Sequence, residues 1–208
     1  MALQTINVKY GALNFDGNII PAYTTGNLTI GNVANPVGNV ITSTELVTAN
    51  LYVGGNIMPS AANATVGIGS PGNWFGTVYG TAYNAKYADL AEKYIADANY
   101  EPGTVLMFGG PTEVTIADQN TTRVAGVVST NPATVMNGEL EGTNVVTLAL
   151  TGRVPCKVIG PVAKGDLLVS AGFGYARTDN GAGVGQIVGR AVNEYVGTGK
   201  AVIEVAVL

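Results

Sequence analysis

Apolar and polar positions divide this chain into many short segments that suit β-strands. In the first half, β-branched residues stand beside Gly or Asn in "LTIGNV" (28–33), "LYVGGNI" (51–57) and "TVGIGS" (65–70), a pattern typical of short strands and tight turns. In the second half, "TVLMFGGPTEVTIA" (104–117) indicates a hairpin, and "RVAGVVST" (123–130) and "NVVTLALTGRVPCKVIG" (144–160) indicate further strands. The dipeptide Pro102–Gly103 before the hairpin predicts a type II turn. We therefore predict a mainly β protein.

One stretch, "AKYADLAEKYIAD" (85–97), has instead the spacing of an amphipathic helix. Its residues Tyr87, Leu90, Ala91 and Tyr94 fall at i, i+3, i+4 and i+7 and would share one apolar face. Asn84 is a suitable N-terminal cap. Because a helix of about three turns is marginal by itself, this face should be buried. We predict that it packs between copies of the chain as a trimer interface, and packing against the chain's own head domain is the alternative.

Charge changes along the chain at the same place. Before Lys86 the only charged residues are Lys9, Asp16 and Glu45, whereas acidic and basic residues are frequent after it. The short strands of the first half cannot fill a core within one chain, which is typical of fibres whose core is shared between chains. We therefore predict a β-rich, shaft-like region over 28–82, a short junction helix over 83–98, and a compact β head domain over 99–208.

Composition excludes several classes of function. The formal net charge is −4, from 10 basic and 14 acidic residues, so the chain has no basic surface for nucleic acid or anionic lipid. It has no histidine and one cysteine, which removes the commonest general base and zinc ligand and any internal disulfide. Cys156 alternates onto the apolar face of its strand, so we do not expect a nucleophile there. No apolar run approaches the roughly 20 residues that span a bilayer. We expect no enzyme activity, no metal or other cofactor, no nucleic-acid partner and no membrane insertion.

Aromatic residues gather just before the predicted helix. The single tryptophan, Trp74, stands beside Phe75 and close to Val78 and Tyr79. The faces of Trp74 and Tyr79 could bind sugar rings. Alternatively the group is a buried plug between shaft and head, which is the commoner role because aromatic side chains mostly stabilise cores and interfaces.

Four motifs, in order, resemble a known family. They are "YADLAEKYIADANYEPGTVLMFGG", "TRVAGVVSTNPATVMN", "LTGRVPCKVIGPVAKGDLLVSAGFGYA" and "VGQIVGRAV". They resemble the C-terminal head domain of bacteriophage tail fibres and related appendages, especially those of phages that infect cyanobacteria. The resemblance covers residues 68 to the end, and "LYVGGNIMPSAANATVGIGSPGNWFGTVYGTA" is similar to the short shaft repeats that precede such heads.

This resemblance implies a virion structural protein that is assembled in the host cytoplasm as a homotrimer. The head would act as a trimerisation or folding module, and residues 1–27 would dock to other virion proteins. The resemblance leaves open whether the protein is a tail fibre, a neck or baseplate appendage, or a capsid decoration protein.

Two other functions remain open. One is an adhesin that binds host surface polysaccharide through Trp74, Tyr79 or tyrosines of the head, since the chain has 10 tyrosines and little charge. The other is an autoproteolytic folding chaperone. Related phage appendage proteins carry a self-cleaving domain that begins with a "YAE" segment similar to "YADLAEKY", and cleavage here would use Ser129, Thr130 or Asn131 with a nearby carboxylate. The ordinary interpretation of "VSTNPA" is a turn.

Overall fold

The computed structural model describes residues 56–57, 67–70 and 72–208. It divides the chain into two units, Met1–Phe75 and Gly76–Leu208. The predicted docking segment 1–27 and most of the predicted shaft region lie outside the described residues, so the structure does not test them. Among the residues that it describes, no helix is long and apolar enough to cross a membrane.

The unit Gly76–Leu208, which we call the head, has strands as its only regular secondary structure, which confirms the prediction of a mainly β fold. Its strands are β1 (Asp89–Ile95), β2 (Val105–Phe108), β3 (Val114–Ile116), β4 (Val124–Val128), β5 (Thr134–Met136), β6 (Val145–Ile159), β7 (Leu167–Gly172), β8 (Tyr175–Thr178), β9 (Ile187–Ala191) and β10 (Lys200–Val207). The predicted hairpin over 104–117 is the antiparallel pair β2–β3. Gly103 before it has the positive φ, 83°, that the second central position of a type II turn requires.

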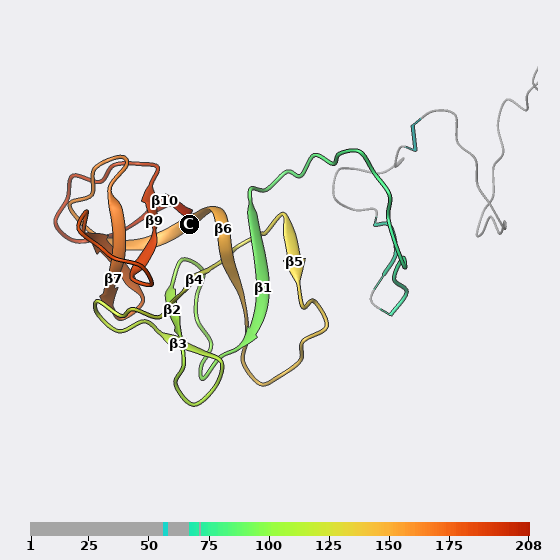
Figure 1. Cartoon of the computed structure of the whole chain (residues 1–208), viewed down its shortest axis with the longest axis horizontal. Coiled ribbons are helices and arrows are strands. Elements are labelled where there is room, and N and C mark those ends of the chain that lie inside the picture. The colour runs from blue at the N-terminus through green and yellow to red at the C-terminus, as the bar shows by residue number, and fades with distance from the viewer. Residues whose placement is uncertain (1–55, 58–66, 71) are drawn as a thin grey trace, which may run out of the picture. The chain divides into compact units, whose positions relative to one another are not determined.

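The long strand β6 joins the two sides of this unit (Figure 1). Its first half pairs with β1 and β4, and its second half pairs with β10. The change of partner falls at Gly152, which is opposite both Asp89 of β1 and Val207 of β10. Gly152 has a φ of 105°, and a Cβ atom there would overlap the carbonyl oxygen of Ala88. Only glycine fits at the point where three strands meet.

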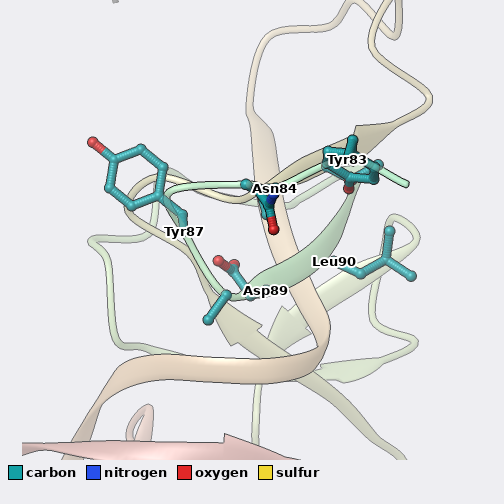
Figure 2. Close-up of a pocket in the computed structure, with 9 residues that line it drawn as sticks. Tyr83, Asn84, Tyr87, Asp89 and Leu90 are labelled. Atoms are coloured by element: carbon teal, nitrogen blue, oxygen red, sulfur yellow. The ribbon is translucent and has the colours of Figure 1, made fainter. Parts of the chain in front are cut away.

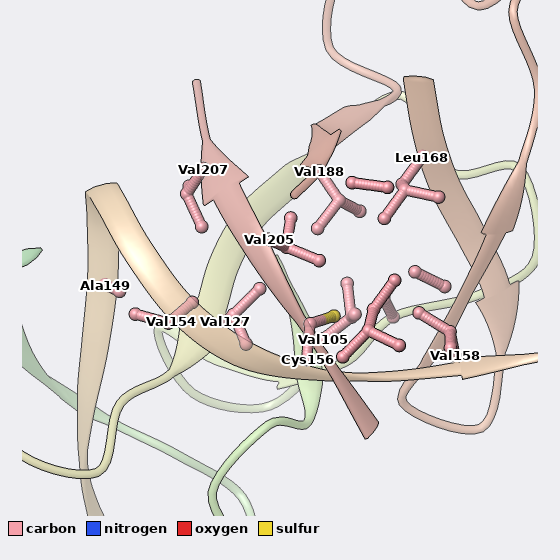
Figure 3. Packing of buried hydrophobic residues seen from close by; sticks show 14 of the residues in the cluster. Val105, Val127, Ala149, Val154, Cys156, Val158, Leu168, Val188, Val205 and Val207 are labelled. Atoms are coloured by element: carbon pink, nitrogen blue, oxygen red, sulfur yellow. The ribbon is translucent and has the colours of Figure 1, made fainter. Parts of the chain in front are cut away.

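The second half of β6 closes a ring of strands around the larger core. β6 pairs with β10, β10 with β9, β9 with β7, β7 with β8, and β8 again with β6. Half of the buried side chains of this core are valines, and Leu168 and Cys156 are among the others (Figure 3). Val154, Cys156 and Val158 alternate along β6 and all point into this core, as their spacing predicts.

The first half of β6 has a second, smaller core on its opposite face. Val146 and Leu148 of β6 pack there with Leu106 and Val114, which come from β2 and β3. The neighbouring residue on β6, Ala149, belongs to the larger core instead. Because adjacent strand residues point to opposite faces, this part of β6 is covered on both sides.

The predicted junction helix over 83–98 is wrong. The structure gives strand β1 over Asp89–Ile95 and no regular secondary structure over residues 76–88. β1 pairs antiparallel with β6 along its whole length and parallel with β5. Differences in helix propensity amount to only a few tenths of a kcal/mol per residue, so two ladders of backbone hydrogen bonds and burial of Ala91 outweigh the helical spacing.

We predict that Gly152→Ala strongly destabilises the head. The new methyl group meets the Ala88 carbonyl oxygen at a φ that alanine rarely adopts, and we expect a loss of at least about 2 kcal/mol in the free energy of unfolding, measured by urea titration. Gly181→Ala is the control, because φ is not positive there and a new Cβ atom would lie at an ordinary 3.6 Å from Oδ1 of Asp179. Equal stability of the two variants would contradict this role of Gly152.

We predict that the buried thiol of Cys156 makes the folded protein lose stability at alkaline pH. Burial raises the pKa of its thiol to about 12 from an ordinary 9.0. As pH rises, the unfolded chain loses this proton before the folded chain does. The contribution to stability is therefore complete below pH 9.0 and is lost as pH rises toward about 12. Urea titrations of wild type and Cys156→Ala just above pH 9.0 test this: the wild type should lose more stability per pH unit than the variant.

Candidate functional site

An open pocket lies where the chain enters β1. It has a volume of about 480 Å³. Its lining comes from the segment before β1, the start of β1 and the segment before β5: Tyr83, Asn84, Ala85, Tyr87, Ala88, Asp89, Leu90, Ala133 and Thr134. Figure 2 shows Asn84 and Asp89 between the ring of Tyr87 on one side and Tyr83 and Leu90 on the other. We call it the Tyr83–Leu90 pocket.

A buried carboxylate lies in this pocket. Asp89 is only 4% exposed, and its Oδ2 accepts a hydrogen bond of 2.6 Å from the Ser129 hydroxyl. Its backbone carbonyl accepts a hydrogen bond of 2.9 Å from the Ala133 amide. Ser129 is itself buried and donates its amide proton to Thr147 of β6. Asp89 therefore connects the start of β1 to the segments after β4 and before β5.

Two tyrosines form the outer part of the pocket. The hydroxyl of Tyr83 lies 2.7 Å from Oγ1 of Thr134, within hydrogen-bond distance, although 72% of Tyr83 is exposed. Tyr87 is 45% exposed, and the Lys86 ammonium lies 5.5 Å from the centre of its ring. The pocket thus combines aromatic rings with an amide, a hydroxyl and a carboxylate, a set that can stack on and hydrogen-bond to an uncharged polar ligand.

The segment that leads into the pocket is aromatic along its length. In residues 76–88, which we call the tyrosine segment, every residue is exposed. Tyr79, Tyr83 and Tyr87 recur there at every fourth position. In an extended chain, positions four apart point to the same side, about 13 Å from one another. The only charged residue in the segment is Lys86.

The four residues predicted as the trimer interface do not share one face. Tyr87 and Leu90 line the Tyr83–Leu90 pocket, whereas Ala91 is completely buried within the head. Tyr94 packs on the second core and its ring meets that of Phe108 edge-on, with centroids 5.7 Å apart. Burial and the nearby Glu92 carboxylate raise the pKa of Tyr94 to about 12. The helical face on which the prediction rested is absent, and a trimer interface at these residues stays a prediction.

The two residues predicted to bind glycans are both exposed. Trp74 is 68% exposed in the first unit, and Tyr79 is 96% exposed in the second. A single chain therefore does not bury these aromatic side chains. Their glycan-binding role and the alternative role as a plug between shaft and head both stay predictions.

Sequence reasoning missed Asp89 and its partner Ser129 as a buried pair. In a helix Asp89 would lie off the apolar face of Tyr87, Leu90, Ala91 and Tyr94, whereas in β1 it is buried, as is Ala91 two residues later. The sequence indicates Ser129 only as a candidate cleavage residue and does not identify the carboxylate near it. The pairing of these two side chains, 40 residues apart, depends on how β1 and β4 both pair with β6, which local sequence patterns do not show.

No protein-family model matches the chain, and no curated protein matches it. Two of the solved structures that are similar to part of it come from one bacteriophage protein. One is the pre-mature bacteriophage phi29 gene product 12, with a TM-score of 0.48 and 12% identity over 64% of this chain and 23% of that chain. The other is a C-terminal fragment of the same gene product, with a TM-score of 0.44 and 15% identity over 58% of this chain and 100% of that chain. The chain thus matches about a quarter of the longer protein.

We predict that the Asp89–Ser129 pair stabilises the head. Asp89→Ala leaves the buried Ser129 hydroxyl without its acceptor, so we expect a loss of about 1–3 kcal/mol in the free energy of unfolding. Asp89→Asn keeps an acceptor oxygen and should lose less. In a double-mutant cycle, Asp89→Ala and Ser129→Ala together should cost less than the sum of the two single changes. Strict additivity would mean that the hydrogen bond contributes nothing.

Proposed function

We propose that this chain is a structural protein of a bacteriophage virion. In this proposal it forms a homotrimeric fibre or appendage, docks to other virion proteins through its N-terminal residues 1–27 and displays the β head. Two observations support it. The four ordered motifs from residue 87 onward resemble phage appendage heads, and the exposed tyrosine segment has the character of an interface between chains.

The tyrosine segment is the observation that carries the proposal. An aromatic side chain buries about 150–250 Å² when it is covered, so Tyr79, Tyr83 and Tyr87 together offer on the order of 500 Å² per chain. The largest apolar patch on a typical monomer is about 300–600 Å² and is often functional, and a stable interface buries about 800 Å² on each partner. Covering these three side chains would thus supply a large part of an ordinary interface.

Identical chains suit this segment as partners. Around a three-fold axis each tyrosine would lie near its own copies, and the low charge of residues 76–88 avoids repulsion between like charges. Small residues between the tyrosines, such as Gly80 and Ala82, allow close approach of the chains. One substitution in such an assembly acts three times.

We predict that Tyr79→Ser weakens the trimer without unfolding the head. Tyr79 is 96% exposed in the single chain, so the head's own stability should change by less than about 0.5 kcal/mol. The concentration at which trimers dissociate should rise at least about tenfold, which for three associating chains is a 100-fold change in the dissociation constant and about 2.7 kcal/mol per trimer. Native mass spectrometry and light scattering across a dilution series measure this, with Thr77→Ala as a control in the same segment. A wild-type chain that is monomeric at micromolar concentration would overturn the homotrimer.

A second candidate is the adhesin, which the chemistry of the Tyr83–Leu90 pocket favours. Its tyrosines, Asn84 and Asp89 suit a neutral sugar, with rings for stacking and planar polar groups for the hydroxyls. Glycan-array binding by the full chain tests this. If the pocket is the glycan-binding site, we expect Tyr83→Ala and Tyr87→Ala to abolish binding. If the upstream aromatic side chains form the site, Trp74→Ala or Tyr79→Ala should abolish binding instead.

A third candidate, the autoproteolytic chaperone, is favoured by the contact between Ser129 and Asp89. A carboxylate 2.6 Å from a serine hydroxyl can accept its proton. Mass spectrometry of purified protein decides the matter: a single species at 21.2 kDa excludes cleavage, whereas two fragments that disappear in Ser129→Ala would establish it.

A further inference from the structure

Phe173 occupies a backbone position that phenylalanine rarely adopts. Gly172 and Tyr175 are partners across the β7–β8 hairpin, so Phe173 and Gly174 form its two-residue turn. Their φ angles are 53° and 75°, both left-handed, as in a type I′ turn. Asn-Gly is the preferred pair in such turns, and a bulky residue at the first position is strained. Local structure therefore gives no reason for phenylalanine here.

The side chain of Phe173 also gains little from its own chain. It is 88% exposed at the tip of the turn. The backbone around it is well held, because the Gly174 carbonyl accepts a hydrogen bond from Val105 and Gly172 lies against Gln119. The Lys200 ammonium lies 4.6 Å from the centre of the ring of Tyr175, the residue that follows the turn. A rigid turn thus projects an exposed aromatic ring, which is typical of an anchor that enters a pocket on a partner.

The chain itself contains a pocket of suitable character. The Tyr83–Leu90 pocket is open, with a volume of about 480 Å³. Two tyrosine rings, Leu90 and three alanines line it together with the polar side chains of Asn84, Asp89 and Thr134, so the rings are the part that an aromatic side chain would pack on. Aromatic rings pack favourably edge-to-face on other rings. Within one copy the two features do not meet, because the Phe173 ring is almost fully exposed. An exposed apolar side chain and a matching pocket elsewhere on the same molecule give a head-to-tail contact, which closes into a ring when the rotation between copies allows it.

We propose that Phe173 of one copy inserts into the Tyr83–Leu90 pocket of the next copy. This inference rests on the proposed homotrimer and adds to it a contact between the head of one chain and the pocket of its neighbour. It also explains why a residue with a strained backbone lies in the turn. The Phe173 side chain stabilises the assembly, and this gain offsets the backbone strain within each chain.

The substitution Phe173→Asn separates assembly from folding. Asparagine suits the type I′ turn, so the thermal midpoint of the full chain, measured below the concentration at which trimers form, should stay the same or rise. The concentration at which trimers dissociate should rise at least tenfold. Val196→Ser is the matched control, since Val196 is 86% exposed but is not in the β7–β8 turn, and it should leave dissociation unchanged. Unchanged dissociation of Phe173→Asn in a chain that does form trimers would overturn this inference and leave the homotrimer standing.

Photo-crosslinking locates the contact. A benzoylphenylalanine at position 173 is activated in trimers mixed from isotopically light and heavy chains, and linked peptides are identified by mass spectrometry. We expect links between light and heavy chains that join position 173 to the peptide containing residues 83–90. Links within one chain, links to another region of the neighbour, or no links from a trimer would each overturn the inference. A chain that is monomeric at every concentration would overturn both this contact and the homotrimer.

Discussion

The fold depends on the backbone pairing of β6 with different strands along its length. Its first half holds β1 and β4, and its second half closes the ring through β10 and β8. The two cores of the head meet at this strand, since Leu148 belongs to one and Ala149 to the other. Gly152 allows the change of partner because any side chain there would overlap the backbone before β1. A single glycine therefore sets how the two sides of the head meet.

The Tyr83–Leu90 pocket is a direct consequence of this pairing. Because β1 pairs with β6 as a strand, Asp89 is buried and accepts a hydrogen bond from Ser129. The residues before β1 remain exposed as the tyrosine segment. If residues 83–98 were a helix, this arrangement would not exist. The chemistry of the pocket therefore depends on a contact between strands that are distant in sequence.

Two parts of the head are unfavourable for the stability of a single chain. The tyrosine segment exposes aromatic side chains in succession, and Phe173 holds a left-handed backbone conformation with an exposed ring. Departures from local rules are expected where a protein meets its partners. In the proposed trimer, the same contact would cover the Phe173 ring and fill the pocket beside Tyr83 and Tyr87, so that surfaces unfavourable in one chain become favourable in three.

The sequence by itself determined the β class, the turn at Gly103, the hairpin over 104–117 and the burial of Cys156. These follow from local rules: alternation along a strand, and the backbone freedom of glycine beside proline. The tertiary structure alone decided the fate of residues 83–98 and the place of Asp89. The spacing of Tyr87, Leu90, Ala91 and Tyr94 suits a helix. A segment with this spacing forms a helix only where pairing with other strands is not more favourable. Here both β6 and β5 pair with these residues. Hydrogen bonds to distant strands leave no periodic pattern in the sequence of the segment that they stabilise, so the strand could not be predicted from that sequence.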